Sequence, residues 1–145
     1  MDEALTSLTR EWLTKAEHDL RNARIVSTVD DGPLDTAIYH CQQAAEKSVK
    51  GCLAALGIPF EKTHDVRRLI QQAAGANPEF AQLAHAAEVL TPYASAFRYP
   101  GLTADAMPSR EEFGQALRHA EGIYRFVLER LPVNAHPDRT REATS

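Results

Sequence analysis

The sequence has few cysteines, and its two, Cys41 and Cys52, cannot pair with each other in the structure that the pattern predicts. If residues 34–56 form one helix, these cysteines lie three turns apart, about 16 Å along its axis. No Cys and His spacing typical of a zinc site surrounds them. The scarcity of cysteine excludes a framework held by disulfides or zinc, and predicts two small core residues in a protein of the reducing cytoplasm.

Long apolar runs are also missing. No stretch approaches the roughly 18 uninterrupted apolar residues that a membrane span requires, and the first part of the chain carries acidic residues without a continuous apolar block. We therefore expect no signal segment and no contact with a membrane. A surplus of positive charge is absent too, because 16 Lys and Arg face 20 Asp and Glu, for a net charge of −4. Any contact with RNA or a nucleotide has to be local.

The motifs of common nucleotide- and metal-dependent enzymes are missing as well. The sequence has no Gly-rich phosphate loop, no Gly-x-Gly-x-x-Gly and no nucleophile elbow. Its only Glu-x-x-His pair, Glu61 and His64, falls in a predicted loop, so a di-iron bundle lacks its second pair. The six histidines stand singly, and no two share the spacing of four that places a metal pair on one helical face. We expect no metal and no cofactor.

What the sequence does contain is apolar residues at helical spacing. A first amphipathic helix runs from about Leu5 to Val26 and ends before a loop of Asp, Gly and Pro. A second helix spans residues 34–56, carries a stripe of small residues and ends at Gly57. The small residues predict a close approach to a neighbouring helix.

Three further helices are expected: one over residues 64–74 capped by Thr63, one opened by Asn77 and Pro78, and one that Ser109 and Glu112 open as a capping box and that ends near Leu131. No alternating strand pattern occurs. The chain is thus predicted to be all-α, an antiparallel four- to five-helix up-and-down bundle over residues 1–131. Residues 132–145 lack periodicity and are expected to form a disordered C-terminal tail.

The second predicted helix has a polar face opposite its small-residue stripe. The residues on it are Tyr39, His40, Gln43, Glu46, Lys47 and Lys50. Glu46 precedes Lys50 by four residues, the spacing of a helical ion pair. Such a face is either simply solvated or functional, and the residue pattern leaves both interpretations open.

A single arginine, Arg98, stands in the aromatic stretch LTPYASAFRYPG. Pro92 breaks the preceding helix and Pro100 disfavours helical geometry at Tyr99, so Arg98 is expected near a helix C-terminus, where cations are stabilised. In one interpretation Arg98 caps that end or pairs with Glu46. In the other it contacts a ligand or partner beside the polar face, because a guanidinium binds phosphate and carboxylate in bidentate geometry.

Three stretches together resemble the HEPN domain, the helical nucleotide-binding domain of higher eukaryotes and prokaryotes. They are TKAEHDL in the first predicted helix, DTAIYHCQQAAEKSVKGCLAALGIPFEKTHDVRRLI across the next two, and LTPYASAFRYPG. The resemblance implies a helical bundle that is usually a homodimer and that, in small members, is often paired with a minimal nucleotidyltransferase as toxin and antitoxin. For some members it also implies a metal-independent ribonuclease, which uses an arginine and a histidine four to six residues later.

This chain departs from that ribonuclease pattern. Arg98 stands at the family's arginine position, but residues 99–105, YPGLTAD, contain no histidine. Arg130 and His136 match the spacing formally, yet Pro132 lies between them, and in a chain with this many arginines and histidines chance alone provides such a pair. The ribonuclease motif is therefore not present where the resemblance places it.

We predict a non-catalytic or weakly catalytic homodimer that binds a nucleotidyltransferase protein partner in a toxin-antitoxin-like pair, and that binds a nucleotide or RNA. The expected contact residues are Gln43, Lys47, His64, Asp65, Arg98 and Tyr99. One alternative is a ribonuclease toxin that combines Arg98 with a histidine from elsewhere in the fold, His64 or His119. Another is a structural helical scaffold without a ligand.

Overall fold

The computed structural model describes residues 2–101 and 107–137, and every regular element in these residues is helical. The α-helices are α1 (Glu3–Ser27), α2 (Leu34–Ala55), α3 (Val66–Ala76), α4 (Ala84–Leu90) and α5 (Arg110–Glu129). Three short 3-10 helices complete the order: η1 (Pro78–Leu83), η2 (Thr91–Ala94) and η3 (Val133–Ala135). The predicted all-α fold is confirmed. Within the described residues, no helix combines the length and apolarity needed to cross a bilayer.

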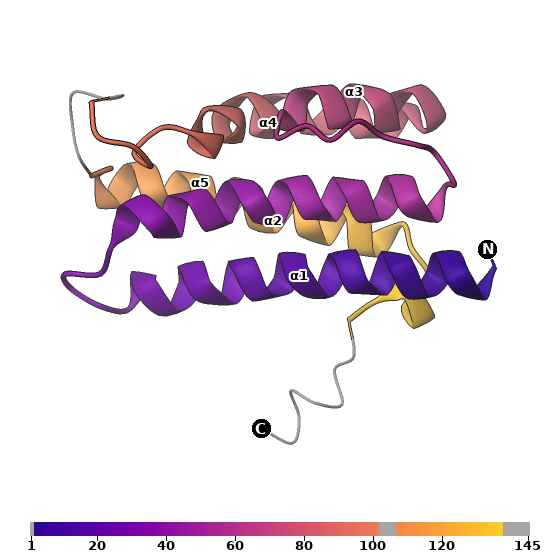
Figure 1. Cartoon of the computed structure of the whole chain (residues 1–145), viewed down its shortest axis with the longest axis horizontal. Coiled ribbons are helices and arrows are strands. Elements are labelled where there is room, and N and C mark those ends of the chain that lie inside the picture. The colour runs from indigo at the N-terminus through magenta and orange to yellow at the C-terminus, as the bar shows by residue number, and fades with distance from the viewer. Residues whose placement is uncertain (1, 102–106, 138–145) are drawn as a thin grey trace, which may run out of the picture.

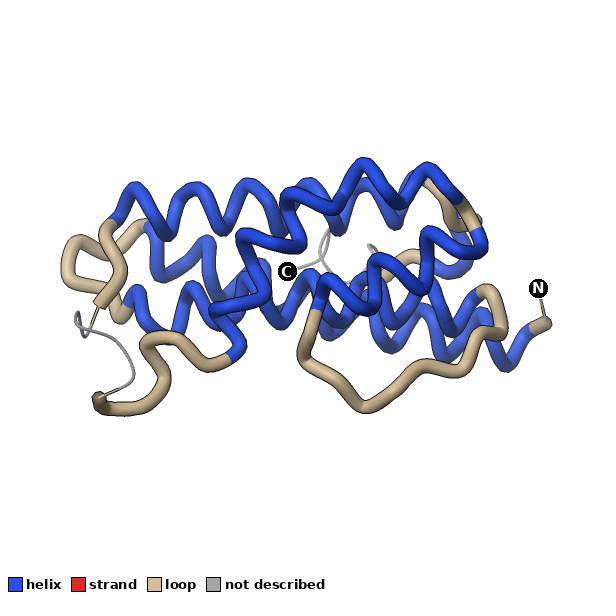
Figure 2. Tube along the Cα trace, turned by 90° about the horizontal axis from the view of Figure 1, so that it is seen from above, coloured by secondary structure: helices blue, strands red, loops and turns tan. Residues whose placement is uncertain are grey.

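The helix α2 occupies the centre of the bundle. In Figure 1 it lies between α1 and the layer formed by α3 and α4, and it also packs against α5. Figure 2 shows the long helices side by side along the long axis of the molecule. Contact on so many sides requires small and apolar residues, and those fully buried on α2 include Ala37, Ile38, Cys41, Ala44, Ala45 and Val49. Several polar side chains of α2 are therefore buried between helices, namely Gln42, Gln43, Glu46, Ser48 and Lys50.

A glycine permits the close approach of α1 to α2. A Cβ atom added at Gly51 would lie 3.1 Å from Trp12 Cβ and 3.4 Å from Leu13 Cδ2. A side chain larger than hydrogen would therefore push the two helices apart, because the interior has no free space to absorb it. Gly51 thus sets the spacing of this helix pair, which agrees with the close approach that the small residues of this helix predict.

The two cysteines are free and buried in the core, as the sequence predicts. Burial raises the pKa of the Cys41 thiol to about 12, with Glu121 and Asp19 adding to the effect. Burial likewise raises the pKa of Cys52, to about 11. Both side chains are neutral thiols at physiological pH and contribute packing rather than chemistry.

The start of α3 differs from the prediction by two residues. Asp65, and not Thr63, caps this helix: its Oδ1 accepts a hydrogen bond from Arg67 N at 3.0 Å, and the helix begins at Val66. Thr63 Oγ1 accepts a hydrogen bond from Asp65 N at 3.1 Å and so stabilises the turn before the cap. The carboxylate is the stronger cap because its negative charge also interacts with the helix dipole.

The start of α5 follows the prediction only in part. Ser109 caps the helix by accepting a hydrogen bond from Glu112 N at 3.0 Å. Glu112 does not complete the capping box, because its Oε2 accepts a hydrogen bond of 2.6 Å from Tyr93 Oη. This bond ties η2 to α5 and fixes the segment that leads to Arg98.

The fourth predicted helix is split into three pieces. Asn77 caps its start by accepting a hydrogen bond from Glu79 N at 3.1 Å, as expected, but the first six residues form the 3-10 helix η1. The α-helical part, α4, is correspondingly short. The predicted break at Pro92 is confirmed, because the chain continues from α4 as the 3-10 helix η2.

The chain remains packed for several residues beyond the predicted end of the domain. Arg10 Nε donates a hydrogen bond of 3.0 Å to Asn134 O, and Ala135 is fully buried. His136 Nε2 lies 2.8 Å from Leu128 O, at the end of α5. The packed part of the chain therefore extends into the region that was expected to be a tail, because η3 packs against the N-terminal half of α1. Residues 138–145 of that region lie outside the described residues.

Candidate functional site

The polar face of α2, formed by Tyr39, His40, Gln43, Glu46, Lys47 and Lys50, is organised by two buried carboxylates. The first is Asp19 of α1, whose side chain is only 9% exposed. Its Oδ1 lies 2.7 Å from His40 Nδ1, and its Oδ2 accepts a hydrogen bond of 2.7 Å from Lys47 Nζ. His40 and Lys47 are seven residues apart, about two helical turns, so they share one face of α2. We call these three residues the Asp19 cluster.

The second carboxylate is Glu46 of α2, whose side chain is 4% exposed. Lys50 Nζ donates a hydrogen bond of 2.9 Å to its Oε2, and His64 Nδ1 lies 2.9 Å from its Oε1. The ion pair with Lys50 was predicted from the spacing, and it is confirmed. These three residues form the Glu46 cluster.

The surroundings of the Glu46 cluster are polar on one side and aromatic on the other. Gln42 Nε2 lies 3.2 Å from Glu46 Oε1 and donates a hydrogen bond of 2.8 Å to His64 O, which attaches the α2–α3 connection to α2. Lys50 Nζ lies 5.7 Å from the ring centroid of Trp12 and 5.9 Å from that of Phe60. A lysine held between two rings and a carboxylate is stabilised by both, which is how α2 accommodates a nearly buried cation.

Glu46 is ionised at neutral pH in spite of its burial. Burial alone would raise the pKa of this carboxyl, but hydrogen bonds from Lys50 and His64, the charge of Lys50 and the hydrogen bond from Gln42 together outweigh it. The pKa of Glu46 is consequently below its usual value of 4.5. The face is therefore built around two fixed negative charges, each with a lysine and a histidine bound to it.

Both histidines have the same orientation relative to their carboxylates. In each cluster the Nδ1 atom faces the carboxylate oxygen, so Nδ1 carries the proton and donates it, and Nε2 points elsewhere. The His64 side chain is 72% exposed and that of His40 is 32% exposed. The Nε2 atom of a neutral ring accepts a hydrogen bond and that of a protonated ring donates one.

The segment around Arg98 has a different construction. Phe97 adopts a left-handed backbone conformation with φ 67°, which costs free energy in a non-glycine residue and turns the chain out of η2. Phe97 stacks on Tyr93, with ring centroids 6.2 Å apart. Arg98 itself is exposed, and Tyr99 is 54% exposed. The segment presents its arginine from an irregular turn rather than from a regular helix.

Arg98 caps the preceding turn and also reaches α2. Its Nη1 donates a hydrogen bond of 2.9 Å to Ala94 O, which agrees with the predicted capping role. Its guanidinium carbon lies 4.0 Å from the ring centroid of Tyr39 and 5.2 Å from that of Tyr99. No ion pair joins Arg98 to Glu46 in the part of the chain that the structure describes. Stacking on Tyr39 is the contact that the sequence did not reveal.

The structure brings together some of the predicted site residues and separates others. Gln43, Lys47 and His64 lie on or against the polar face of α2, and Arg98 touches its edge through Tyr39. Asp65 caps α3, and its Oδ1 lies 3.3 Å from Arg67 Nε, so its carboxylate serves the start of this helix. The ring of Tyr99 lies beside the Arg98 guanidinium.

Three histidines have neighbours that sequence reasoning did not foresee. His119, a predicted alternative partner of Arg98, lies against His85 of α4. His136 contacts main-chain carbonyls, and Arg130 donates hydrogen bonds of 2.9 and 2.6 Å to Glu79. The arginine and histidine that match the ribonuclease spacing formally therefore hold neighbouring segments together. His40 was predicted on the polar face but not among the contact residues, and its contact with Asp19 was not foreseen.

A signal for Asp19 was present in the sequence. It follows Ala16 by three residues and precedes Ala23 by four, which places it on the buried face of α1. A carboxylate there requires a partner from another helix.

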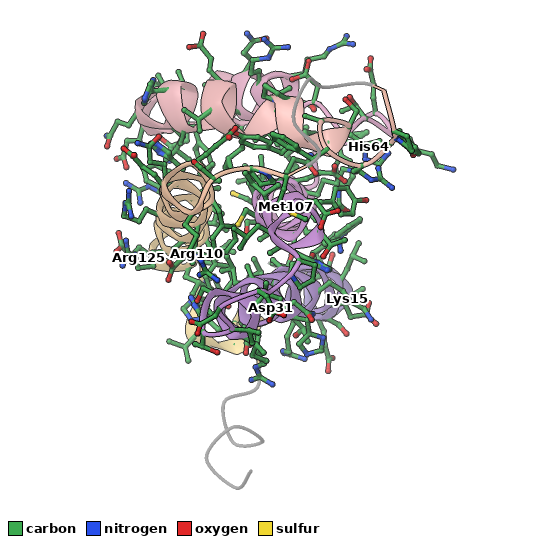
Figure 3. All side chains as sticks on the ribbon, turned by 90° about the vertical axis from the view of Figure 1, so that its left-hand side faces the viewer. Lys15, Asp31, His64, Met107, Arg110 and Arg125 are labelled. Atoms are coloured by element: carbon green, nitrogen blue, oxygen red, sulfur yellow. The ribbon has the colours of Figure 1, made fainter. Side chains whose placement is uncertain are left out.

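The side chains of Lys15 and His64 lie on the same flank of the molecule. Figure 3, viewed along the bundle, shows Lys15 of α1 and His64 on this flank, along which the α2–α3 connection passes in Figure 1.

Comparison with known proteins places the chain in a family. The sequence profile of the HEPN domain matches residues 9–131. The crystal structure of ST0689, described as an archaeal HEPN homologue, superposes with a TM-score of 0.67 at 27% identity, covering 84% of this chain and 96% of that one. TT1696 from Thermus thermophilus superposes with a TM-score of 0.72 at 32% identity, covering 85% and 98%. None of the curated proteins matches the chain. The profile match spans most of the sequence, and the chain belongs to the HEPN domain family.

Proposed function

We propose that this HEPN protein is a dimeric binding module, the partner of a minimal nucleotidyltransferase in a toxin-antitoxin-like pair, and that it binds a nucleotide on the polar face of α2. One observation carries the proposal: the Asp19 and Glu46 clusters hold two histidines and two lysines in fixed positions, His40, Lys47 and Lys50 on α2 and His64 on the connection that packs against it. Fixed donors bind an anion with little loss of side-chain entropy, since the ordering cost is already met in the folded protein.

The donors left over in the Asp19 cluster suit a phosphate group. A lysine ammonium has three N–H donors, and Asp19 takes one from Lys47. The exposed Lys15 lies one turn before Asp19 on α1 and adds a second ammonium group, and His40 Nε2 becomes a further donor when the ring is protonated. These groups supply positive charge and hydrogen bonds locally, in a protein whose overall charge is −4.

The neighbours of Arg98 favour a binding function for this protein over RNA cleavage. The residues that follow it in the sequence, 99–105, contain no histidine, and its guanidinium stacks on Tyr39. The histidines first considered as its partners are held elsewhere, His64 by Glu46 and His119 beside His85. An arginine that caps a turn and stacks on a ring is suited to contacting a partner or a ligand.

An affinity pull-down at near-endogenous expression level tests the partnership. The tagged chain is recovered from its native source, co-purifying proteins are identified by mass spectrometry, and the mass of the isolated protein is measured by light scattering. We expect a nucleotidyltransferase in stoichiometric amount and a dimer mass for this chain. A monomer that recovers no partner would contradict the proposal.

A ribonuclease remains the second candidate because of one specific contact. The ring of Tyr39, on which Arg98 stacks, lies 6.1 Å from the ring of His40, and His40 is held by the buried Asp19. A carboxylate-bound histidine is the usual form of a general base. If this is the activity, expression arrests growth, and both Arg98→Ala and His40→Ala relieve the arrest. Equal harmlessness of the wild type and both variants would exclude it.

The third interpretation is a scaffold without a ligand. A ligand that binds only the folded protein raises its melting temperature, and at a concentration 100 times the dissociation constant the stabilisation is about 2.7 kcal/mol. The scaffold interpretation expects no change in melting temperature with any nucleotide at millimolar concentration. A shift that depends on nucleotide concentration would exclude it.

A further inference from the structure

A cavity lies between the α2–α3 connection and α3. Its volume is about 550 Å³, and its walls include Phe60 and Glu61 of the connection and Arg68, Leu69 and Gln72 of α3. In Figure 1 the connection runs back along α3, so two separate segments of the chain form the cavity. The volume falls within the range of roughly 300–1,000 Å³ that is typical of small-molecule sites in proteins.

The apolar part of the cavity is held in place by its neighbours. Gln72 Nε2 donates a hydrogen bond of 2.6 Å to Pro59 O, which ties the connection to α3. The ring of Phe60 packs edge to face with that of Trp12 from α1, with centroids 6.0 Å apart. Leu69 is fully buried and adds an aliphatic wall. A flat ring can bind against such fixed groups with little loss of side-chain entropy.

The charged part of the cavity is one carboxylate beside one guanidinium. Glu61 Oε2 and Arg68 Nη2 lie 3.5 Å apart, and the two side chains are 71% and 63% exposed. Within the described residues this ion pair is the one polar contact of either side chain. An exposed pair of this kind contributes little to stability, so a ligand can engage both groups at a small cost.

The two groups require a ligand with donors next to acceptors, because a carboxylate only accepts hydrogen bonds and a guanidinium only donates them. Guanine has this arrangement on one edge. Its N1–H and 2-amino groups can donate to a carboxylate, and the neighbouring O6 and N7 can accept from a guanidinium in bidentate geometry. Adenine has an amino group at the position of O6, which would direct a donor at the guanidinium.

We propose that this cavity binds the base of a guanine nucleotide. The edge of the base contacts Glu61 and Arg68, and its ring lies against Phe60, since unpaired bases stack on aromatic side chains. The inference rests on the proposed function and names the nucleotide that the protein prefers.

The position of the cavity connects it to the polar face of α2. Lys50 Nζ of the Glu46 cluster lies 5.9 Å from the ring centroid of Phe60. Thr63, which also lines the cavity, directly precedes His64 of the same cluster. A nucleotide can therefore place its base in the cavity and its phosphates on the polar face. Adenine nucleotides keep the phosphate contacts and lose those of the base edge, so they should bind more weakly.

Calorimetric titration of the full chain with guanosine, adenosine and inosine monophosphates (GMP, AMP and IMP) tests the proposal. We expect GMP to bind about tenfold or more tightly than AMP, because bidentate contacts discriminate strongly between bases. IMP lacks the 2-amino group and should bind with intermediate affinity. Glu61→Gln and Arg68→Lys should each reduce the preference for GMP, and both residues are exposed, so the variants keep the fold. Lys62→Ala changes an exposed residue of the connection outside the cavity and should bind as the wild type does.

A variant of the polar face separates this inference from the proposed function. Lys47→Ala should weaken the binding of GMP and AMP alike, whereas Glu61→Gln should weaken that of GMP alone. Equal affinity for GMP and AMP in the wild type, or an unchanged preference in both cavity variants, would overturn the guanine site and leave nucleotide binding standing. No binding of any of the three nucleotides would overturn both.

Guanine can come from a free nucleotide or from single-stranded RNA, because the contacts with the cavity are the same. Titration with the RNA UUUGUUU and with a heptauridylate distinguishes the two sources. Tighter binding of UUUGUUU than of GMP, lost in the heptauridylate, assigns the site to RNA. The opposite order assigns it to the free nucleotide.

Discussion

The polar face of α2 and the segment around Arg98 both carry positive charge, but they hold it in opposite ways. On the polar face of α2, each lysine and histidine of the two clusters, including His64 from the α2–α3 connection, is bound to a carboxylate that is less than a tenth exposed. Arg98 stands on an irregular turn, with a main-chain carbonyl and two rings as its neighbours. The first region is rigid because regular helices enclose it. The second is exposed, and its position depends on a strained residue, Phe97.

This difference indicates a division of labour between the two regions. Fixed charges on a central helix contribute to stability and can position a ligand at the same time. An exposed arginine contributes little to stability and is free to contact a partner. Substitutions in the clusters should therefore change both folding and binding, whereas substitutions at Arg98 should change binding alone.

The largest effect on stability is expected from Glu46→Ala. It leaves Lys50, whose side chain is 9% exposed, without its carboxylate, and an unpaired buried charge costs about 3–5 kcal/mol. Urea denaturation of the variant and the wild type measures the difference in the free energy of unfolding. Glu61→Ala, which breaks an exposed pair with Arg68, is the matched control and should cost less than about 1 kcal/mol. Equal losses in both variants would remove the distinction between buried and exposed charge.

A smaller loss is expected from Asp19→Ala. Its partners, His40 and Lys47, are 32% and 24% exposed and can be hydrated once the carboxylate is gone. We expect a loss of about 1–3 kcal/mol in the free energy of unfolding, again by urea denaturation. A loss larger than that of Glu46→Ala would show that solvent access to the partners does not set the ranking of the two clusters.

Acid pH should weaken the Glu46 cluster in a defined direction. Because the folded-state pKa of Glu46 is below its usual 4.5, the stabilisation it provides is fully present above the unfolded-state pKa and is lost as the pH falls through the folded-state pKa. The urea concentration at the midpoint of unfolding is measured from neutral pH downwards. In the wild type it should decrease once the pH is below about 4.5. Glu46→Gln removes this titration, so its midpoint should change less over that range. Parallel profiles for the two proteins would assign the acid sensitivity to other groups.

The smallest effect on stability is expected from Arg98→Ala. An exposed cation stacked on a ring contributes about 0.5–1 kcal/mol, and the hydrogen bond to Ala94 adds to it only slightly. Circular dichroism melting curves should therefore nearly coincide with the wild type. Arg98→Lys retains the charge and loses the planar stacking, which separates the two contributions. A large destabilisation by Arg98→Ala would show that the segment depends on its arginine for folding and would contradict the division of labour.

The helices were predictable because their signals are local. Apolar spacing and the caps Asn77 and Ser109 act within a few residues, and the structure places both caps as expected. The cap of α3 was predicted at Thr63 instead of Asp65 because both residue types cap helices and stand two positions apart. Propensity alone does not decide between such neighbours.

The contacts between helices were the part that the sequence could not specify. His85 and His119 are 34 residues apart in the chain and show no periodic relation, yet α4 and α5 bring their rings together. The stacking of Arg98 on Tyr39 depends on how η2 meets α2 and on the left-handed turn at Phe97. Asp19 was readable in principle, as a charged residue on a buried face, but its two partners required the packing of α1 against α2.

The most direct test of the central claim asks whether the response to a nucleotide depends on the polar face of α2. The melting temperature of the full chain is measured with and without millimolar ATP in the wild type, in Lys47→Ala and in Arg125→Ala, whose exposed arginine is on α5 and lies on the side opposite Lys15 and His64 in Figure 3. Binding on the polar face of α2 predicts a rise in the wild type and in Arg125→Ala that is lost in Lys47→Ala. An undiminished rise in Lys47→Ala, or no rise in the wild type, would contradict nucleotide binding at this site.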